Sequence, residues 1–179
     1  MGRGAAGGTA ATSAEKRVSM VAGGVGGWFR EAGWPRTGMR TVDYIEGGWP
    51  GANPTDNAFF AALPKTKATI TAFGMTKRAG RSAENDDVLA AVLNAGTSSV
   101  CLVGKTHDFH VETALGISLA ENIDAIRLSI AHIVAQGREA IFDAEHFFDG
   151  YKSNPAFALE SLKAALGEFA AQRRGSQRS

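Results

Sequence analysis

The stretch that decides the fold is residues 99–145, SVCLVGKTHDFHVETALGISLAENIDAIRLSIAHIVAQGREAIFDAE. It opens and closes on short apolar runs, 99–103 and 140–144, which are typical of buried strands. Between them, a capping box at residues 118–121 (SLAE) begins a helix that Gly137 ends. The apolar residues of this helix recur at spacings of three and four: Leu119, Ile123, Ile126, Ile130 and Ile133. The segment therefore predicts two parallel strands joined by a helix.

The same alternation extends outward in both directions, with a repeat of roughly thirty residues. Asn53-Pro54 and Asn154-Pro155 are each a good N-cap and first-turn pair for a helix. The predicted strands are 42–46, 68–73, 99–103 and 140–144, and the predicted helices begin at Asn53-Pro54, Ala83, Ser118 and Asn154-Pro155. Four strands alternating with helices predict an α/β fold around a parallel sheet.

Composition excludes several classes of protein. The chain has 179 residues, with 19 Lys+Arg against 18 Asp+Glu, and this near-neutral balance argues against nucleic acid or an anionic membrane as a partner. The single cysteine, Cys101, excludes an internal disulfide framework. No apolar run reaches the length of a spanning helix, so a cytoplasmic protein is expected.

Three segments differ in character. Residues 1–40 are rich in Gly and Ala and are expected to be partly disordered. Residues 41–171 carry the strand and helix patterns, and residues 172–179 are expected to be a disordered basic tail. One organised domain is therefore predicted over 41–171.

Polar residues gather at the carboxyl ends of the predicted strands, where parallel α/β folds bind ligands. They are Glu46 after the first strand, Thr76 and Lys77 after the second, Lys105, Thr106, His107, Asp108 and His110 after the third, and Asp143, Glu145, His146 and Asp149 at the fourth. A period of two places Asp143 and Glu145 on the same side of their strand. Carboxylates there can act as bases or metal ligands, although each could also simply cap a loop.

Other motifs carry less information. Gly104-Lys105-Thr106 resembles the end of a phosphate loop, but the glycine required five positions earlier is Ser99. His107 and His110 form an H-x-x-H pair on a predicted loop without a third ligand, which indicates coincidence or a substrate contact. Cys101 lies within a predicted strand and is interpreted as a buried apolar residue.

Five blocks of sequence resemble the citramalate synthases, part of the pyruvate-carboxyltransferase-like group that includes isopropylmalate synthases and hydroxymethylglutaryl-CoA lyase. They are VDYIEGGWPG at 42–51, Asn53-Pro54, AFG with TKR at 72–78, GK with HDFHV at 104–111, and FDAEHFFDGYK at 142–152. The resemblance implies part of a (β/α)8 TIM barrel, about strands two to five with their helices. It also implies condensation of acetyl-CoA with pyruvate or a related 2-oxo acid, assisted by a divalent metal. By the same resemblance Glu145 is a catalytic residue, while Glu46, Thr76 and His110 bind substrate.

The sequence also departs from that family. Its D-T-T-L-R-D-G motif, which holds the oxo acid and the metal, does not occur, and no two histidines form its H-x-H pair. The metal ligands of the family are therefore not present in this chain. A whole barrel of this type needs about 250 residues. These departures predict an incomplete, self-associating piece of such an enzyme that is inactive alone. A working synthase and an unrelated α/β small-anion-binding module remain the alternatives.

Overall fold

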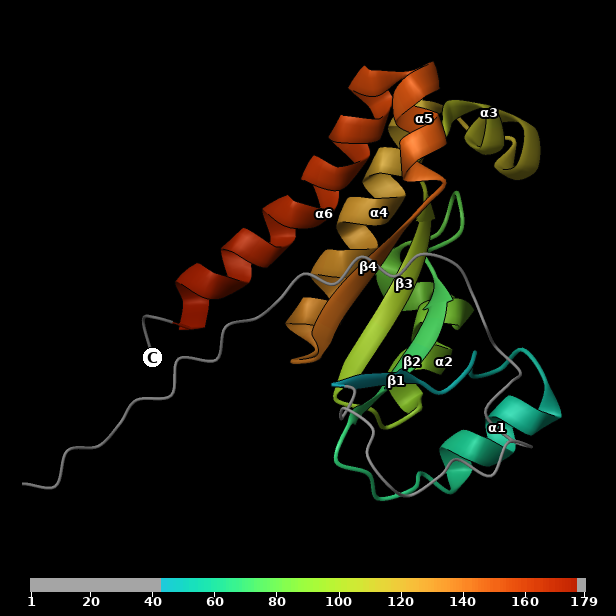
Figure 1. Cartoon of the computed structure of the whole chain (residues 1–179), viewed down its shortest axis with the longest axis vertical. Coiled ribbons are helices and arrows are strands. Elements are labelled where there is room, and N and C mark those ends of the chain that lie inside the picture. Colours follow the sequence, from blue (N-terminus) through green and yellow to red (C-terminus); the bar gives the residue numbers. More distant parts are fainter. Residues whose placement is uncertain (1–42, 177–179) are drawn as a thin grey trace, which may run out of the picture.

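The computed structural model describes residues 43–176, with side chains described as far as residue 167. The segment predicted to be disordered, 1–40, lies outside the described residues. Four parallel strands form one curled sheet in the order β1-β2-β3-β4, which confirms the α/β prediction and is consistent with part of a TIM barrel (Figure 1). The strands are β1 (Tyr44–Glu46), β2 (Thr69–Met75), β3 (Ser99–Lys105) and β4 (Glu139–Glu145).

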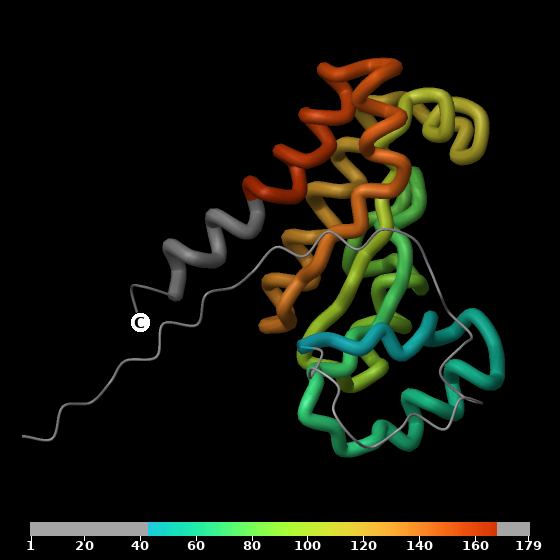
Figure 2. The backbone as a smooth tube through the Cα atoms, in the orientation of Figure 1, coloured from blue at the N-terminus to red at the C-terminus, as the bar shows by residue number. Residues whose placement is uncertain are grey.

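The hydrophobic core lies between one face of the sheet and the helices α2 (Asp87–Asn94) and α4 (Leu119–Ala135), which lie on one side of it (Figure 1). Alternate strand residues such as Leu102 and Phe142 point into this layer and meet the apolar stripe of α4. The stripe predicted from the spacing is confirmed, since Ile126, Ile130 and Ile133 are fully buried. Helix α6 (Pro155–Ser176) runs along α4 as a further layer (Figure 2).

The opposite face of the sheet, called the inner face below, carries the other alternate residues. The strand register places Cys101 beside Phe73 and Ile141, and Lys105 beside Glu145. Cys101 is 2% exposed, so its interpretation as a buried residue is confirmed. Alternation along the strands thus separates an apolar, helix-covered face from an inner face that bears the ionisable groups.

Helix starts follow the predicted caps. The Asn53 side chain accepts from Asp56 N at 2.9 Å to begin α1 (Pro54–Ala61), and the Ser118 side chain accepts from Glu121 N at 3.2 Å to begin α4. Gly137, at φ +73°, follows the end of α4 in a left-handed conformation that glycine adopts without strain. At the last predicted cap, Asn154 Oδ1 accepts from Phe157 N at 3.2 Å.

Three local predictions need correction. The helix predicted to begin at Ala83 is a short 3-10 turn, η1 (Ala83–Asn85), followed by α2, because the buried Asp86 side chain caps α2. The loop predicted around His107 and His110 is instead the short helix α3 (Asp108–His110) followed by a π turn, η2 (Val111–Leu115). A further helix, α5 (Phe147–Ser153), was not predicted.

At the C-terminal end, α6 continues beyond residue 171 to Ser176. Among the helices of the described residues, none has the length and apolar character needed to cross a bilayer.

Candidate active site at the strand ends

An ion pair joins the ends of the two neighbouring strands β3 and β4. Lys105 Nζ contacts Glu145 Oε2, and both side chains are partly buried. The two residues are register partners, so their side chains leave the inner face side by side. The pair therefore holds the Glu145 carboxylate at the carboxyl end of the sheet, where parallel α/β folds bind ligands.

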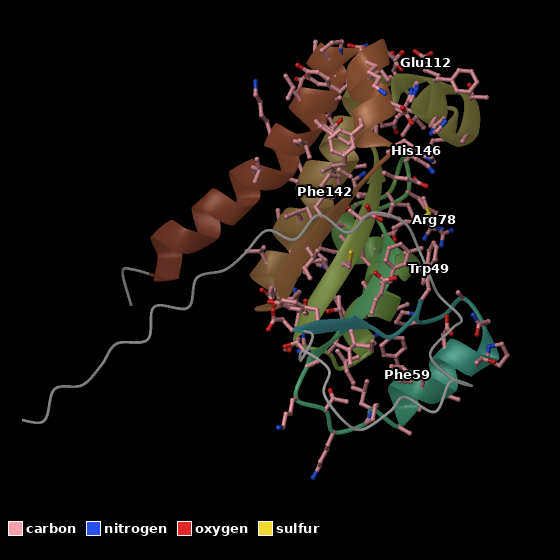
Figure 3. All side chains as sticks on the ribbon, viewed as in Figure 1. Trp49, Phe59, Arg78, Glu112, Phe142 and His146 are labelled. Atoms are coloured by element: carbon pink, nitrogen blue, oxygen red, sulfur yellow. The ribbon has the colours of Figure 1, made fainter. Side chains whose placement is uncertain are left out.

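The backbone at Glu145 is held just as firmly. Thr106 is fully buried and contacts Glu145 O twice, through its N at 3.2 Å and its Oγ1 at 2.7 Å. His146 then turns the chain into α5 with φ +57°, the only positive φ of a non-glycine residue among those the structure describes. Figure 3 shows His146 at the end of the sheet where β4 passes into α5. Such a φ costs free energy and persists where the surroundings fix it, often at functional sites.

Gly150 allows α5 to sit directly on the loop after β3. A Cβ at this position would lie 2.3 Å from Thr106 O, closer than any real side chain approaches a backbone oxygen. The Gly150 N–H also donates to His146 O at 2.8 Å, which closes the first turn of α5. Loop 106–107, the end of β4 and α5 therefore form one tightly packed unit around Glu145.

Besides Glu139 at the start of β4, three carboxyl groups lie on the inner face: Glu46, Asp143 and Glu145. Burial raises the pKa of Asp143, and the charge of Glu145 adds to this while His146 opposes it. Burial also raises the pKa of Glu46, with a smaller contribution from the charge of Asp143. Glu145 differs from the other two because it has the Lys105 ammonium as its partner. Glu46 and Asp143, whose pKa values are raised, are thus the better proton carriers of the three, and Glu145 is the one that forms an ion pair.

Imidazole rings border the carboxyl groups on the side of α3. The His107 and His110 rings stack with centroids 4.8 Å apart, and the His110 and His146 rings meet edge to face at 4.5 Å. Burial lowers the pKa of His110, and the nearby His146, His107 and Lys105 lower it further, against the charge of Glu145. His146 Nε2 lies 4.0 Å from Glu145 Oε1, so the imidazoles and the carboxylates form one continuous polar site.

The predicted site residues are thus partly brought together. Glu145 and His110 lie together at the ends of β3 and β4 and interact electrostatically, while Glu46, at the end of β1, interacts with Asp143. Thr76 is 9% exposed, and its N donates to Val103 O at 3.2 Å. It continues the alternation of Ala72 and Gly74, which face the helices, and none of the contacts described for this chain joins it to the other three.

The divalent metal that the resemblance implies does not fit the residues described. Within residues 43–167 no three His, Cys, Asp or Glu side chains are arranged to hold a metal ion. The Lys105 ammonium also occupies the Glu145 carboxylate, which a cation would otherwise approach. No chemical step is therefore assigned to a metal in this part of the chain.

Sequence reasoning left Lys105, Asp143 and His146 out of the predicted site, although it had noted them at strand ends. Strand register was the missing signal, because it pairs Lys105 with Glu145 and Val103 with Asp143. The ion pair also explains the false phosphate-loop signal: Lys105 belongs to strand β3 and Thr106 holds the backbone of β4. A groove of about 460 Å3 between α4 and α6 contains none of these residues.

Comparison with known proteins returns the same family as the motifs. No family model matches the chain. It is similar to the (R)-citramalate synthases of Geobacter sulfurreducens and Synechocystis, at 49% identity over 127 residues, and of Streptomyces coelicolor, at 45% over 128 residues. Each match covers 69% of this chain and 23–24% of the relative, so the chain spans about a quarter of the length of these relatives. Over that stretch the resemblance indicated by the motifs is confirmed, and the chain is similar to part of a citramalate synthase.

Proposed function

We propose that residues 43–167 build the 2-oxo-acid side of a citramalate synthase-type active site, corresponding to strands two to five of a (β/α)8 barrel. The product would be citramalate and CoA, formed from acetyl-CoA, pyruvate and water. The observation that carries the proposal is the grouping of Asp143, Glu145 and His110 toward the ends of β3 and β4, with Glu46 interacting with Asp143, within a segment similar to those enzymes. The same similarity favours this function over an unrelated anion-binding module.

The residues described divide the chemistry between them. Glu145, fixed by Lys105 and by the backbone contacts of Thr106, presents a charged carboxylate to the bound oxo acid. Asp143 and Glu46, whose pKa values are raised mainly by burial, can carry protons to and from reacting oxygen or carbon atoms. His110 interacts electrostatically with Glu145 and can donate a hydrogen bond to the oxo acid. We include Thr76 as a support for the end of β2 next to this site.

In this proposal the acetyl group is activated by groups other than residues 43–167. The described residues contain no group of side chains arranged to hold a metal ion. The proposed turnover needs such a metal site. We therefore propose that the chain by itself does not form citramalate. Release of free CoA from acetyl-CoA and pyruvate with added divalent metal is the direct assay. Metal-dependent turnover by the 179-residue chain would overturn this part of the proposal.

A segment exchange tests the site itself. In the Geobacter sulfurreducens relative, the aligned stretch is replaced by the corresponding residues of this chain, and CoA release is measured. We expect the chimera to be active and Glu145→Gln within it to lower kcat by about a hundredfold or more, the scale of a lost acid–base or charged group.

Glu139→Gln is the matched control for the segment exchange. Glu139 lies at the start of the same strand and accepts a hydrogen bond from Tyr44 Oη at 2.9 Å, which an amide oxygen can also accept. Activity should survive this change. An active chimera in which Glu145→Gln has no more effect than Glu139→Gln would contradict the assignment of Glu145.

A further inference from the structure

Three imidazoles converge beside Lys105, two of them from the single turn of α3 with its N-cap and one from the junction of β4 and α5. We call His107, His110 and His146 the imidazole cluster. His107 precedes α3, His110 ends it, and His146 lies at the junction of β4 and α5. The ring of His110 lies between the other two, with centroids at 4.8 Å and 4.5 Å. The convergence depends on β3 and β4 being neighbours, because His146 and His107 follow the ends of these two strands.

The carboxylates near His110 each contact another basic group. Glu145, from β4, is engaged by Lys105 and lies 4.0 Å from His146 Nε2. Asp108, from α3, contacts His107 Nδ1 at 3.0 Å. Among the described residues no carboxylate forms an ion pair with His110. His110 is thus the member of the cluster that faces three potential cations and has no anion of its own.

We propose that Lys105 and the imidazole cluster form a carboxylate-binding subsite, and that a bound carboxylate is accompanied by uptake of a proton at His110. The ammonium of Lys105 has three N–H donors, and the pair with Glu145 leaves others able to bind a second carboxylate. A protonated His110 adds a charge-assisted donor beside it. The ligand class is a small 2-oxo carboxylate, an identity that rests on the proposed function. The subsite itself rests on the geometry.

The direction of the proton linkage follows from the charges. Burial, His146, His107 and Lys105 hold the pKa of His110 below its ordinary value, so the free protein carries His110 mostly neutral at neutral pH. A carboxylate placed among these groups stabilises the imidazolium and raises that pKa. Binding therefore takes up protons near neutral pH, and affinity increases as the pH falls toward the ordinary histidine pKa.

Calorimetry on the full 179-residue chain tests the proposal, with pyruvate, acetate and the neutral analogue pyruvamide as probes. Titrations at pH 7 in two buffers of different ionisation enthalpy report the number of protons taken up per ligand. We expect uptake with pyruvate and its loss in His110→Gln. Lys105→Met should weaken binding by roughly ten- to a hundredfold, the effect of one charge-assisted hydrogen bond. The control His132→Gln changes the remaining histidine, which lies in α4 away from the cluster, and should keep the uptake.

The binding outcomes test the subsite without testing the proposed reaction. Equal binding of pyruvate and acetate, both with uptake lost in His110→Gln, supports the subsite and removes its link to 2-oxo acids. Binding of pyruvamide as tightly as pyruvate, uptake that persists in His110→Gln, or no binding of any of the three probes overturns the subsite. None of these results decides whether the chimera described above releases CoA, so the two proposals can fail independently.

Discussion

At the scale of single residues, the candidate site depends on a few positions where packing or backbone conformation restricts the side chain. Gly150 is one, because any side chain there meets the carbonyl of Thr106. His146 is another, because it holds a left-handed backbone between the strand and α5. Both positions fix the direction in which Glu145 leaves the sheet, and His146 also belongs to the proposed carboxylate-binding subsite. A substitution at Gly150 therefore reports on the framework of the site alone.

Gly150→Ala should destabilise the protein. The added methyl would lie 2.3 Å from Thr106 O, so α5 must move away from the loop after β3. Overpacking of this kind costs about 1–3 kcal/mol of unfolding free energy, measurable by urea denaturation. The control is Gly167→Ala in α6, where nothing lies within 4 Å and alanine should stabilise the helix by about 0.5–1 kcal/mol. Equal effects of the two changes would contradict the close packing described.

Asp143→Asn should alter how stability depends on pH. Burial, then the Glu145 charge, raises the pKa of Asp143 in the folded protein, so folding favours its protonated form. Its contribution to stability is complete below the ordinary aspartate value of 3.8 and is lost as the pH rises through the raised folded value. An amide has no such loss. Urea denaturation from about pH 4 to about pH 7 should therefore show that the unfolding free energy of the variant rises relative to that of the wild type as the pH rises. A constant difference would count against the raised pKa.

At the scale of helices and strands, caps explain where the elements begin. Asp86 is 1% exposed and accepts from Val88 N at 2.9 Å and Leu89 N at 3.1 Å, which starts α2. Its other oxygen accepts from Arg78 N at 2.9 Å, and this contact ties the loop after β2 to the helix. One buried side chain thus sets both the helix start and the path of a loop at the strand ends.

Asp86→Ala should remove these three hydrogen bonds at once. We expect a loss of about 1–3 kcal/mol of unfolding free energy, since buried backbone N–H groups are left without partners. Asp87→Ala is the control, because Asp87 is exposed and its ion pairs with Arg78 and Arg81, at 3.5 and 3.3 Å, are solvated. Such pairs contribute roughly 0–1 kcal/mol. Similar losses in the two variants would exclude a special role for Asp86.

The sequence predicted the elements with strong periodicity or clear caps, and it predicted few of their contacts. The stripe of α4 and the cap at Asn53 are local signals, so both could be read directly. Helix α5 was missed because its seven residues, FFDGYKS, show no helical periodicity and begin at a residue with positive φ. The Lys105–Glu145 pair was missed because it depends on register between strands forty residues apart. Local patterns carry no information about such register.

At the scale of the whole molecule, the four strands that the structure describes form an open sheet. Among the described residues β1 and β4 each have one strand as a neighbour, so each presents an edge with unpaired backbone groups. On the inner face, Thr71 Oγ1 and Ser99 Oγ are buried without a hydrogen-bond partner in the structure. The two hydroxyls belong to the central strands, so it is the open edges that favour the addition of further strands.

We therefore predict that the chain self-associates. Sedimentation velocity at micromolar concentration should show species heavier than the 18.7 kDa monomer, because parallel edges pair readily with other strands. Several large apolar side chains are also exposed and add to this tendency: Phe109, Phe148, Tyr151, Leu159 and Leu166. A single monomeric species across that concentration range would contradict the prediction.

Cys101 gives the open sheet a built-in reporter. It is the only cysteine in the sequence, it lies in the middle of β3, and burial together with the charges of Glu46 and Asp143 raises the pKa of its thiol. A thiol held protonated and covered reacts with a disulfide reagent only when β3 separates from its neighbours. The rate of labelling in the native protein therefore measures the free energy of opening at the centre of the sheet. Any ligand that closes the strand ends will slow that rate in proportion to its occupancy.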